Sequence, residues 1–390
     1  MKKTVTTALL MAGMIFLQAQ SIQKQGNHCD LGIDINSNYS KANILDSLMK
    51  AYTTHLLPGV SIAVYTEKEG WWAGAEGNAN IEKKRAMDKC HLQYIQSVSK
   101  MYLAVEMLQL KEKSKINFDE PITKYLPAKY SRYIKGADKI TVKMLLNHQS
   151  GVPEYNSNPL FVSLVMQSPT HYFSQEDCLK SIKDEEPMFA SGTKFKYANT
   201  NYLLLSLIAD AITGDHAAYI RTHIFKPMGL KNTYYALDHK YLNNLYIADS
   251  YWDVFNENKP ANITNLQLPT VACSKGDDGI VCTPVDAVKF LKAVIEGKLL
   301  NEVSMKEIFD FVKDEKGNNK YGMGMYYLDL GGLPAYGHGG GGIGAGCGLI
   351  YIPSHKTYLF ISTNVGVLTE GKLPKAADEL KTQVLMALLQ

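Results

Sequence analysis

Cysteine is scarce in this chain of 390 residues, which has six, none of them in a Cys-x-x-Cys pair. This spacing argues against a zinc site built from cysteine clusters. An even number of cysteines permits disulfides in an oxidising compartment, and Cys273 with Cys282 is the pair close enough in sequence to suspect. Buried free thiols are the equal alternative.

Net charge is also small, because 41 Lys and Arg residues are balanced by 38 Asp and Glu residues, a formal charge of +3. A balance of this kind gives no reason to expect nucleic acid or an anionic membrane as partner. The hydrophobic share of 46% is ordinary for a globular protein and supports a large core in two lobes. The expected partner is a small-molecule or peptide substrate, and the sequence does not indicate the oligomeric state.

Long apolar runs are absent after the N-terminus, so no transmembrane helix is expected there. Residues 1–20 have the pattern of a signal peptide, with Lys2 and Lys3, an apolar run from 8 to 17 and Ala19 near a cleavage point. A buried N-terminal helix is the alternative. We expect a soluble mature protein without stable membrane insertion, exported to a bacterial periplasm or the medium.

Strand patterns occur at both ends of the chain and helical patterns occupy the middle. Residues 21–39 resemble a flexible leader. The remaining expected elements are a helix at 43–55, strands at 59–66 and 70–77, mainly helices at 141–236, a helix capped by Thr283 with Gly297 past its end, strands at 322–330, 345–353 and 357–366, and a helix at 374–390. This order predicts an α+β fold, with an antiparallel sheet domain (40–95 and 275–390), a mainly helical inserted domain (96–274) and the active site at their interface.

The first stretch whose residues could act in catalysis is YIQSVSKM at 94–101, which contains Ser97 and Lys100. Ser-x-x-Lys occurs four times in the chain, so the spacing alone is a weak signal. Here strong helix formers follow, and a serine in the first turn would share a helix face with Lys100 near unpaired backbone N–H groups. Ser97 is therefore either a helix cap or a nucleophile beside its base.

Two further stretches carry polar groups beside regular elements. Tyr197-Ala198-Asn199 stands just before an apolar helix, and a tyrosine near a lysine can act as a base, although a packed aromatic is the alternative. The run GHGGGGIGAG at 337–346 satisfies Gly-x-Gly-x-x-Gly, but it leads into a strand rather than a helix, which excludes a dinucleotide fingerprint. Glycine suits a strand edge that a ligand approaches closely, and His338 stands at its start.

In order, Ser97-x-x-Lys100, Tyr197-x-Asn199 and His338-x-Gly340 resemble the motifs of the serine β-lactamase and penicillin-binding-protein superfamily, in its class C β-lactamase, D-aminopeptidase and esterase-like branch. LLNHQSGVPEY at 145–155 and DDGIVCTPVDAVKFLKAVIEG at 277–297 also resemble it. The resemblance covers nearly all of residues 40–390 and implies a β-lactamase/transpeptidase-like fold.

The resemblance implies an acyl-enzyme on Ser97, with Lys100 or Tyr197 as general base. Asn199 would bind the substrate amide or orient Lys100, and the backbone N–H groups of Ser97 and Gly341 would form the oxyanion hole. His338 and Gly340 would line the substrate site. No metal or organic cofactor is implied. His148, in the loop before Gly151, is interpreted as a hydrogen-bonding loop residue.

His338 departs from the lysine that many β-lactamases and DD-peptidases have there. A mostly neutral histidine is a poorer partner for a substrate carboxylate and favours esters, D-amino-acid amides or small peptides. The alternatives are a true β-lactamase or DD-carboxypeptidase, and a non-catalytic β-lactam- or peptide-binding protein on the same fold. An α/β-hydrolase is disfavoured because no Gly-x-Ser-x-Gly occurs.

Overall fold

The computed structural model describes residues 29–235 and 246–390, and the predicted signal peptide lies outside them. Residues 32–390 form one compact unit, centred on a sheet whose nine strands all pair antiparallel with their neighbours. Their spatial order is β3 (Arg85–Ala86), β2 (Gly70–Asn80), β1 (Gly59–Thr66), β14 (Thr357–Thr363), β13 (Gly346–Ile352), β12 (Pro334–Gly341), β11 (Tyr326–Asp329), β10 (Asn319–Tyr321) and β9 (Val312–Lys313). The predicted sheet built from both ends of the chain is confirmed.

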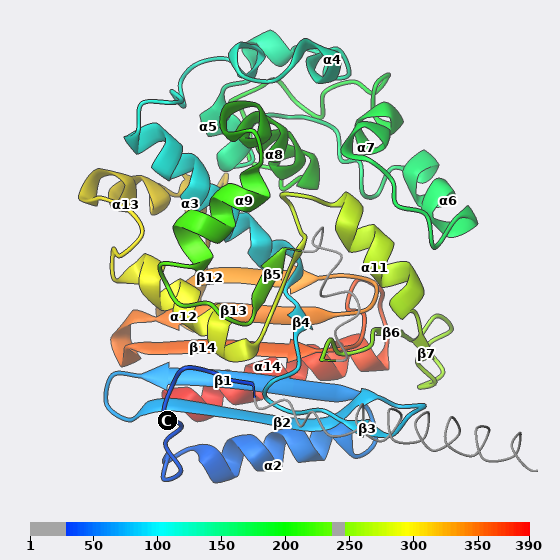
Figure 1. Ribbon diagram of the computed structural model, residues 1–390, viewed down its shortest axis with the longest axis vertical. Helices are drawn as coiled ribbons and strands as arrows, with labels where there is room; N and C mark the ends of the chain where they lie inside the picture. The colour runs from blue at the N-terminus through cyan, green and yellow to red at the C-terminus, as the bar shows by residue number, and fades with distance from the viewer. Residues whose placement is uncertain (1–28, 236–245) are drawn as a thin grey trace, which may run out of the picture. The chain divides into compact units, whose positions relative to one another are not determined.

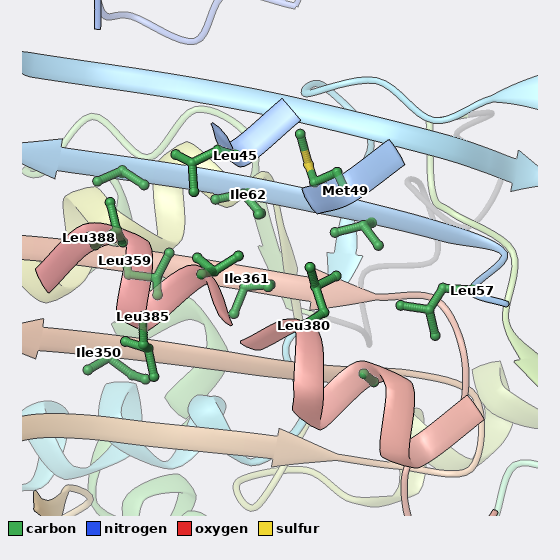
Figure 2. Packing of buried hydrophobic residues seen from close by; sticks show 14 of the residues in the cluster. Leu45, Met49, Leu57, Ile62, Ile350, Leu359, Ile361, Leu380, Leu385 and Leu388 are labelled. Atoms are coloured by element: carbon green, nitrogen blue, oxygen red, sulfur yellow. The ribbon is translucent and has the colours of Figure 1, made fainter. Parts of the chain in front are cut away.

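Two helices, α2 (Ala42–Thr53) and α14 (Lys372–Leu389), cover one face of the sheet. Alternate residues of β1, such as Ile62, point to this face because strand side chains alternate in direction. Figure 2 shows Leu380, Leu385 and Leu388 of α14 packed against the strands. Leu380 is fully buried, and this layer forms an apolar core between the two helices and the sheet.

The opposite face is covered by α12 (Pro284–Ile295), which contacts β1, β14 and β13. Its start is as predicted: the Thr283 side chain accepts a hydrogen bond from the N–H of Asp286, and Pro284 is the first helical residue. Gly297 lies just past the end with a φ of 67°, a left-handed conformation that glycine adopts at low cost.

The middle of the chain is mainly helical, as expected, and lies above the sheet in Figure 1. Its elements are η2 (Gln96–Val98), α3 (Ser99–Glu112), η3 (Ile122–Lys124), α4 (Ala128–Ser131), η4 (Ala137–Lys139), α5 (Val142–Leu146), α6 (Pro159–Gln167), α7 (Gln175–Ser181), α8 (Asn199–Thr213), α9 (His216–Ile220), η5 (Arg221–Phe225) and α11 (Thr264–Cys273). It belongs to the same compact unit as the sheet, because α3 and α8 pack on each other and η2 packs on β12 and β13.

The remaining elements are short. One small sheet has the order β4 (Gln93–Tyr94), β8 (Ile280–Cys282), β5 (Thr233–Tyr235), and another pairs β6 (Tyr251–Trp252) with β7 (Ala261–Asn262). The last described pieces are α13 (Glu302–Ile308) and η6 (Pro353–His355).

Two of the segments expected from the sequence differ from the structure. The strand predicted at 322–330 begins only at Tyr326, because Gly324, with a φ of 76°, turns the chain against α3, where a side chain would lie 2.7 Å from Ala104 Cβ. Residues 32–39, predicted as leader, are packed on β2: the N–H of Asn36 donates to Trp71 O at 2.8 Å, and the Tyr39 ring stacks on Trp72.

The suspected Cys273–Cys282 disulfide is wrong, since both residues are buried free thiols. The reason is direction: Cys273 Sγ, at the end of α11, donates back to Thr270 O at 3.0 Å, while Cys282 belongs to the central strand of its small sheet. Cys178 and Cys347 are also free, and Cys29 and Cys90 are disulfide-bonded cysteines.

Within 29–235 and 246–390, no single helix is long and apolar enough to cross a membrane. One helix pair, Asn199–Thr213 with His216–Phe225, meets the criteria together but is bent by 82°.

Candidate active site

Ser97 lies in the 3₁₀ turn η2, which continues directly into α3. The interpretation of Ser97 as a helix cap is wrong, because neither η2 nor α3 has a side-chain hydrogen bond at its start. Every residue of α3 from Ser99 to Leu110 is buried, so the turn that carries Ser97 is attached to a rigid part of the core.

Lys100 is fully buried, and its Nζ contacts three oxygens. It lies 3.0 Å from Ser97 Oγ, 2.8 Å from Asn199 Oδ1 and 2.7 Å from the backbone oxygen of Asp277. Burial lowers the pKa of Lys100 below its usual 10.5, and the negative charge of Asp277 acts in the opposite direction. The structure thus places a buried amine with a lowered pKa beside the serine hydroxyl.

Tyr197 lies close to both Ser97 and Lys100, and Lys100 Nζ is 5.1 Å from the centre of the tyrosine ring. The Tyr197 hydroxyl is buried and has no hydrogen-bond partner among the described residues. Burial raises the pKa of Tyr197 well above 10, and the nearby Ser97 hydroxyl counters part of this rise. The phenol therefore keeps its proton at neutral pH.

Asn199, the first residue of α8, is positioned by Glu154. The backbone N–H of Asn199 donates to Glu154 Oε2 at 2.5 Å, while its side chain receives the hydrogen bond from Lys100. Burial raises the pKa of Glu154, and hydrogen bonds from the N–H groups of Asn156 and Asn199 oppose this. This carboxylate fixes the start of α8 and with it the amide oxygen that orients Lys100.

His338 faces the same site from β12, only 2% exposed. Its Nδ1 lies 2.5 Å from Gly339 O and its Nε2 lies 3.0 Å from the Tyr321 hydroxyl. Burial, aided by the charge of Lys100, lowers the pKa of His338 to about 3. The imidazole is therefore neutral, and it does not supply the cation that lysine would supply there.

The two predicted glycines occupy opposite faces of β12. Gly341 lines the cavity next to Ser97. Gly340 instead faces the nucleophile turn, where a side chain would lie 2.5 Å from Ile95 O and 2.6 Å from Cys347 Sγ. Gly340 was expected to line the substrate site, but it faces away from the cavity because successive strand residues point in opposite directions. Since Gly340 has no side chain, β12 can approach η2 closely at this point.

A cavity of about 310 Å³ opens over Ser97. Its lining brings together the predicted Ser97, Tyr197, Asn199, His338 and Gly341, while Lys100 lies beneath them. The other lining residues are Gln96, Asn156, Gln267, Thr270, Val271, Ser274, Asp277, Asp278, Tyr326, Gly339, Gly342, Ile343 and Leu368.

Sequence reasoning missed several of these neighbours. Glu154 and Asp277 lie within the stretches at 145–155 and 277–297 that resemble the superfamily, and an acidic residue in such a stretch was the available signal. Gln96 left no signal, because its φ of 50° is a property of the folded chain. His148 is a buried hydrogen-bonding loop residue, as interpreted: its Nδ1 accepts from the N–H of Ala198 at 3.3 Å.

Within the part of the chain that the structure describes, no group of three or more His, Cys, Asp or Glu residues could hold a metal ion.

Comparison with known proteins identifies the family of this chain. The family model described as Beta-lactamase matches residues 44–382. A penicillin-binding protein of Bacillus subtilis (strain 168) is 25% identical over 304 residues, 73% of this chain and 64% of the relative. The teichoic acid D-alanine hydrolase of Staphylococcus aureus (strain NCTC 8325 / PS 47) is 24% identical over 68% of this chain and 62% of the relative. The chain thus spans less than two thirds of the length of these relatives.

Among solved structures, the D-amino acid amidase from Ochrobactrum anthropi SV3, complexed with L-phenylalanine amide, superposes with a TM-score of 0.78 at 23% identity, over 90% of this chain and 99% of that one. At this identity the likeness shows the fold, which is the predicted β-lactamase/transpeptidase-like fold.

Proposed function

Since the chain belongs to the Beta-lactamase family, within the superfamily of serine β-lactamases and penicillin-binding proteins, we propose that it is an exported serine hydrolase that cleaves ester or amide bonds through an acyl-enzyme on Ser97. One observation carries the proposal: Lys100 Nζ, buried and with a lowered pKa, lies 3.0 Å from Ser97 Oγ at the floor of the cavity. A serine hydroxyl is a weak nucleophile until a neighbouring base accepts its proton.

The contacts of Lys100 support its role as that base. Asn199 Oδ1 and Asp277 O are acceptors only, so each takes one N–H of the amine. The third N–H of the charged amine donates to Ser97 Oγ, and once the amine is neutral this position is a lone pair that can accept the serine proton. Lys100 accepts the Ser97 proton as Oγ attacks the substrate carbonyl carbon.

Tyr197 serves as the proton donor to the leaving group. Its raised pKa keeps the hydroxyl protonated, and Tyr197 lines the cavity with its ring centre 5.1 Å from Lys100 Nζ. When the tetrahedral intermediate collapses, the phenol donates its proton to the departing oxygen or nitrogen and regains one from Lys100. Water then releases the acyl group by the reverse sequence of proton transfers. The coupled pair shares one proton through the cycle.

The developing oxyanion is stabilised by the backbone N–H groups of Ser97 and Gly341, which flank the cavity. Losing one such donor typically costs about 3 to 4 kcal/mol in the activation barrier. The neutral His338 favours substrates without a carboxylate at the leaving-group end. This supports esters or amides of D-amino acids, in line with the named activities of the D-alanine hydrolase and the D-amino acid amidase.

Export is supported by the N-terminal Lys2, Lys3 and the apolar run that follows. The disulfide-bonded Cys29 and Cys90 fit an oxidising compartment such as the periplasm or the medium.

The test is hydrolysis of p-nitrophenyl acetate by the wild type and by Ser97→Ala, with folding checked by circular dichroism. We expect the Ser97→Ala variant to lose at least about 10³-fold in kcat/KM, since a residual rate survives without the nucleophile. Ser131→Ala, on the surface helix α4, is the matched control and should keep the wild-type rate. Equal rates for Ser97→Ala and the wild type would refute the assignment.

The alternatives predict other outcomes. A true β-lactamase or DD-carboxypeptidase would turn over benzylpenicillin or D-Ala-D-Ala peptides far faster than simple esters. A binding protein on the same fold would turn over neither class, and β-lactam labelling of Ser97 would identify it.

A further inference from the structure

A second cavity, of about 290 Å³, lies outside the active site, where α12 meets the end of β1 and the start of β2. None of its lining residues lines the cavity over Ser97. We call it the α12 cavity, and the polar part of its lining is made of Tyr65, Trp71, Lys289, Lys292 and Lys298. The proposed hydrolase reaction uses none of these side chains, so the cavity has no role in it.

One wall of the α12 cavity is aromatic. Tyr65 and Trp71 are paired across β1 and β2, and their ring centres lie 4.9 Å apart. Cross-strand aromatic pairs stabilise a sheet, but this pair is also partly exposed and offers ring surface on which another ring can stack. Met228 and Ala293 add apolar surface to the lining.

The charged groups of the lining are all lysines. Lys292 Nζ lies 4.7 Å from the centre of the Tyr65 ring, which places this ammonium group at the aromatic wall. Glu296, which does not line the cavity, forms ion pairs with both Lys292 and Lys298, and Lys298 Nζ is 2.7 Å from Glu296 Oε2. One carboxylate therefore holds two ammonium groups side by side and neutralises only one of the two charges.

The third lysine, Lys289, lies one turn before Lys292 on α12. Its Nζ is 3.7 Å from Oδ1 of Asp286, whose side chain is fully buried. The three lysines and the two carboxylates that pair with them thus carry a net positive charge.

The hydrogen-bonding groups of the lining are nearly all donors. Ammonium groups and the indole N–H of Trp71 can only donate, and among the lining side chains only the Tyr65 hydroxyl is a strong acceptor. This chemistry suits a ligand that supplies acceptors, because a carboxylate or phosphate accepts charge-assisted hydrogen bonds from lysine. The aromatic wall suits a ring attached to that anion.

We propose that the α12 cavity binds a small organic anion, whose phosphate or carboxylate group contacts Lys292 and Lys298 while an attached ring rests on Trp71. Its volume of about 290 Å³ is at the small end of the range for ligand sites, which indicates one ring rather than a chain of rings. The apolar face of a sugar and a planar aromatic ring would use the same contacts. The proposal does not depend on the proposed function, since the two cavities have no lining residue in common.

The experiment measures dissociation constants by isothermal titration calorimetry at low salt for inorganic phosphate, glucose 6-phosphate and phenyl phosphate. All three probes carry the phosphate, and the last two add a sugar ring or an aromatic ring. We expect at least one ring-bearing probe to bind the wild type about tenfold or more tightly than inorganic phosphate, and the tighter of the two identifies the ring. Glucose and phenol, which lack the anion, should bind far more weakly than the phosphate that carries the same ring.

Two variants test the two walls with the tighter probe. Lys292→Met should weaken binding about tenfold or more, because a charge-assisted hydrogen bond is lost. Trp71→Leu should weaken binding about threefold or more, because the stacking surface is lost. Lys313→Met, at an exposed lysine of β9 outside the cavity, is the matched control and should bind as the wild type does. Lys298→Met, at a more exposed lysine, replaces Lys292→Met if that variant does not fold.

Three outcomes would overturn the proposal. The first is that no probe binds, and the second is that inorganic phosphate binds as tightly as both ring-bearing probes. The third is wild-type affinity in Lys292→Met and Lys298→Met, because the probe would then occupy another place. Binding is read directly and without turnover, so a failure of this proposal and a failure of the Ser97 assignment are distinguishable.

Discussion

His338 Nε2 lies 3.0 Å from the hydroxyl of Tyr321, while His338 Nδ1 faces the backbone oxygen of Gly339 at 2.5 Å. A carbonyl can only accept, so Nδ1 carries the proton and Nε2 accepts from the tyrosine. These two contacts hold a neutral imidazole in one tautomer at the place where many relatives of this superfamily have a lysine.

The first prediction concerns acid stability. The pKa of His338 is about 3 in the folded protein and near 6.5 in an unfolded chain, so the unfolded state binds the proton first as pH falls from 6.5 to 3. The free energy of unfolding therefore decreases in this window, by about 2 kcal/mol between pH 7 and pH 5 for this group. In urea denaturation, the free energy of unfolding of His338→Gln should decrease between pH 7 and pH 5 by about 2 kcal/mol less than that of the wild type.

His171→Gln is the control, because His171 is exposed. Its stability should change with pH as that of the wild type does. An equal loss between pH 7 and pH 5 in His338→Gln and the wild type would contradict a buried neutral His338.

The second prediction separates the two candidate bases. Since Lys100 has a lowered pKa and Tyr197 a raised one, kcat/KM for an ester should rise with pH as Lys100 loses its proton. Tyr197→Phe should lower kcat/KM by about 10² to 10⁴-fold and keep this rise, while Lys100→Met should remove it. Profiles of kcat/KM from pH 5 to 9, measured for the wild type and both variants, show which of the two residues is the base. A tyrosinate base is indicated instead if Tyr197→Phe abolishes the rise.

Local sequence patterns were enough for the elements and for the nucleophile pair. The strand pattern at 59–66 and the cap at Thr283 are short-range signals, and the three-residue spacing of Ser97 and Lys100 places them together on a helical turn. The strand at 322–330 was overpredicted because the close packing of Gly324 on α3 is a tertiary constraint.

The surroundings of the pair could not be predicted, since they depend on contacts far apart in sequence. The Asp277 oxygen that accepts from Lys100 is 177 residues away from it. Likewise, the face that Gly340 presents follows from the register of β12 with β13, which pairs Gly340 with Cys347. A motif locates such residues along the chain, and only the fold determines which way they face.

The third prediction uses Asp278, a cavity residue that is 8% exposed and whose Oδ1 accepts from the N–H of Gly279 at 2.7 Å. Burial raises the pKa of Asp278 to about 7, above the 3.9 of an unfolded chain. Below pH 4 the protonated carboxyl of Asp278 makes its full contribution to the stability of the folded protein. This contribution is lost as pH rises to 7, which lowers the free energy of unfolding by up to about 4 kcal/mol. Asp278→Asn keeps the acceptor, so it should stabilise the protein more at pH 8 than at pH 5.

Chemical denaturation at pH 5 and pH 8 measures this difference. Asp138→Asn, at an exposed position, should show no comparable change between the two pH values. A gain for Asp278→Asn that is the same at both would mean that Asp278 is ionised throughout.

The last prediction compares two neighbouring glycines of β12. A methyl group at Gly340 would lie 2.5 Å from Ile95 O, a backbone atom beside the nucleophile turn, whereas at Gly339 the nearest contact is Cys347 O at 3.9 Å. Gly340→Ala should therefore destabilise the protein by about 1 to 3 kcal/mol and lower kcat/KM by shifting Ser97 away from Gly341. Gly339→Ala should retain the melting temperature of the wild type. Thermal unfolding and ester hydrolysis of both variants test the close approach of β12 to η2, and equal melting temperatures would show that the strand and the turn can separate freely.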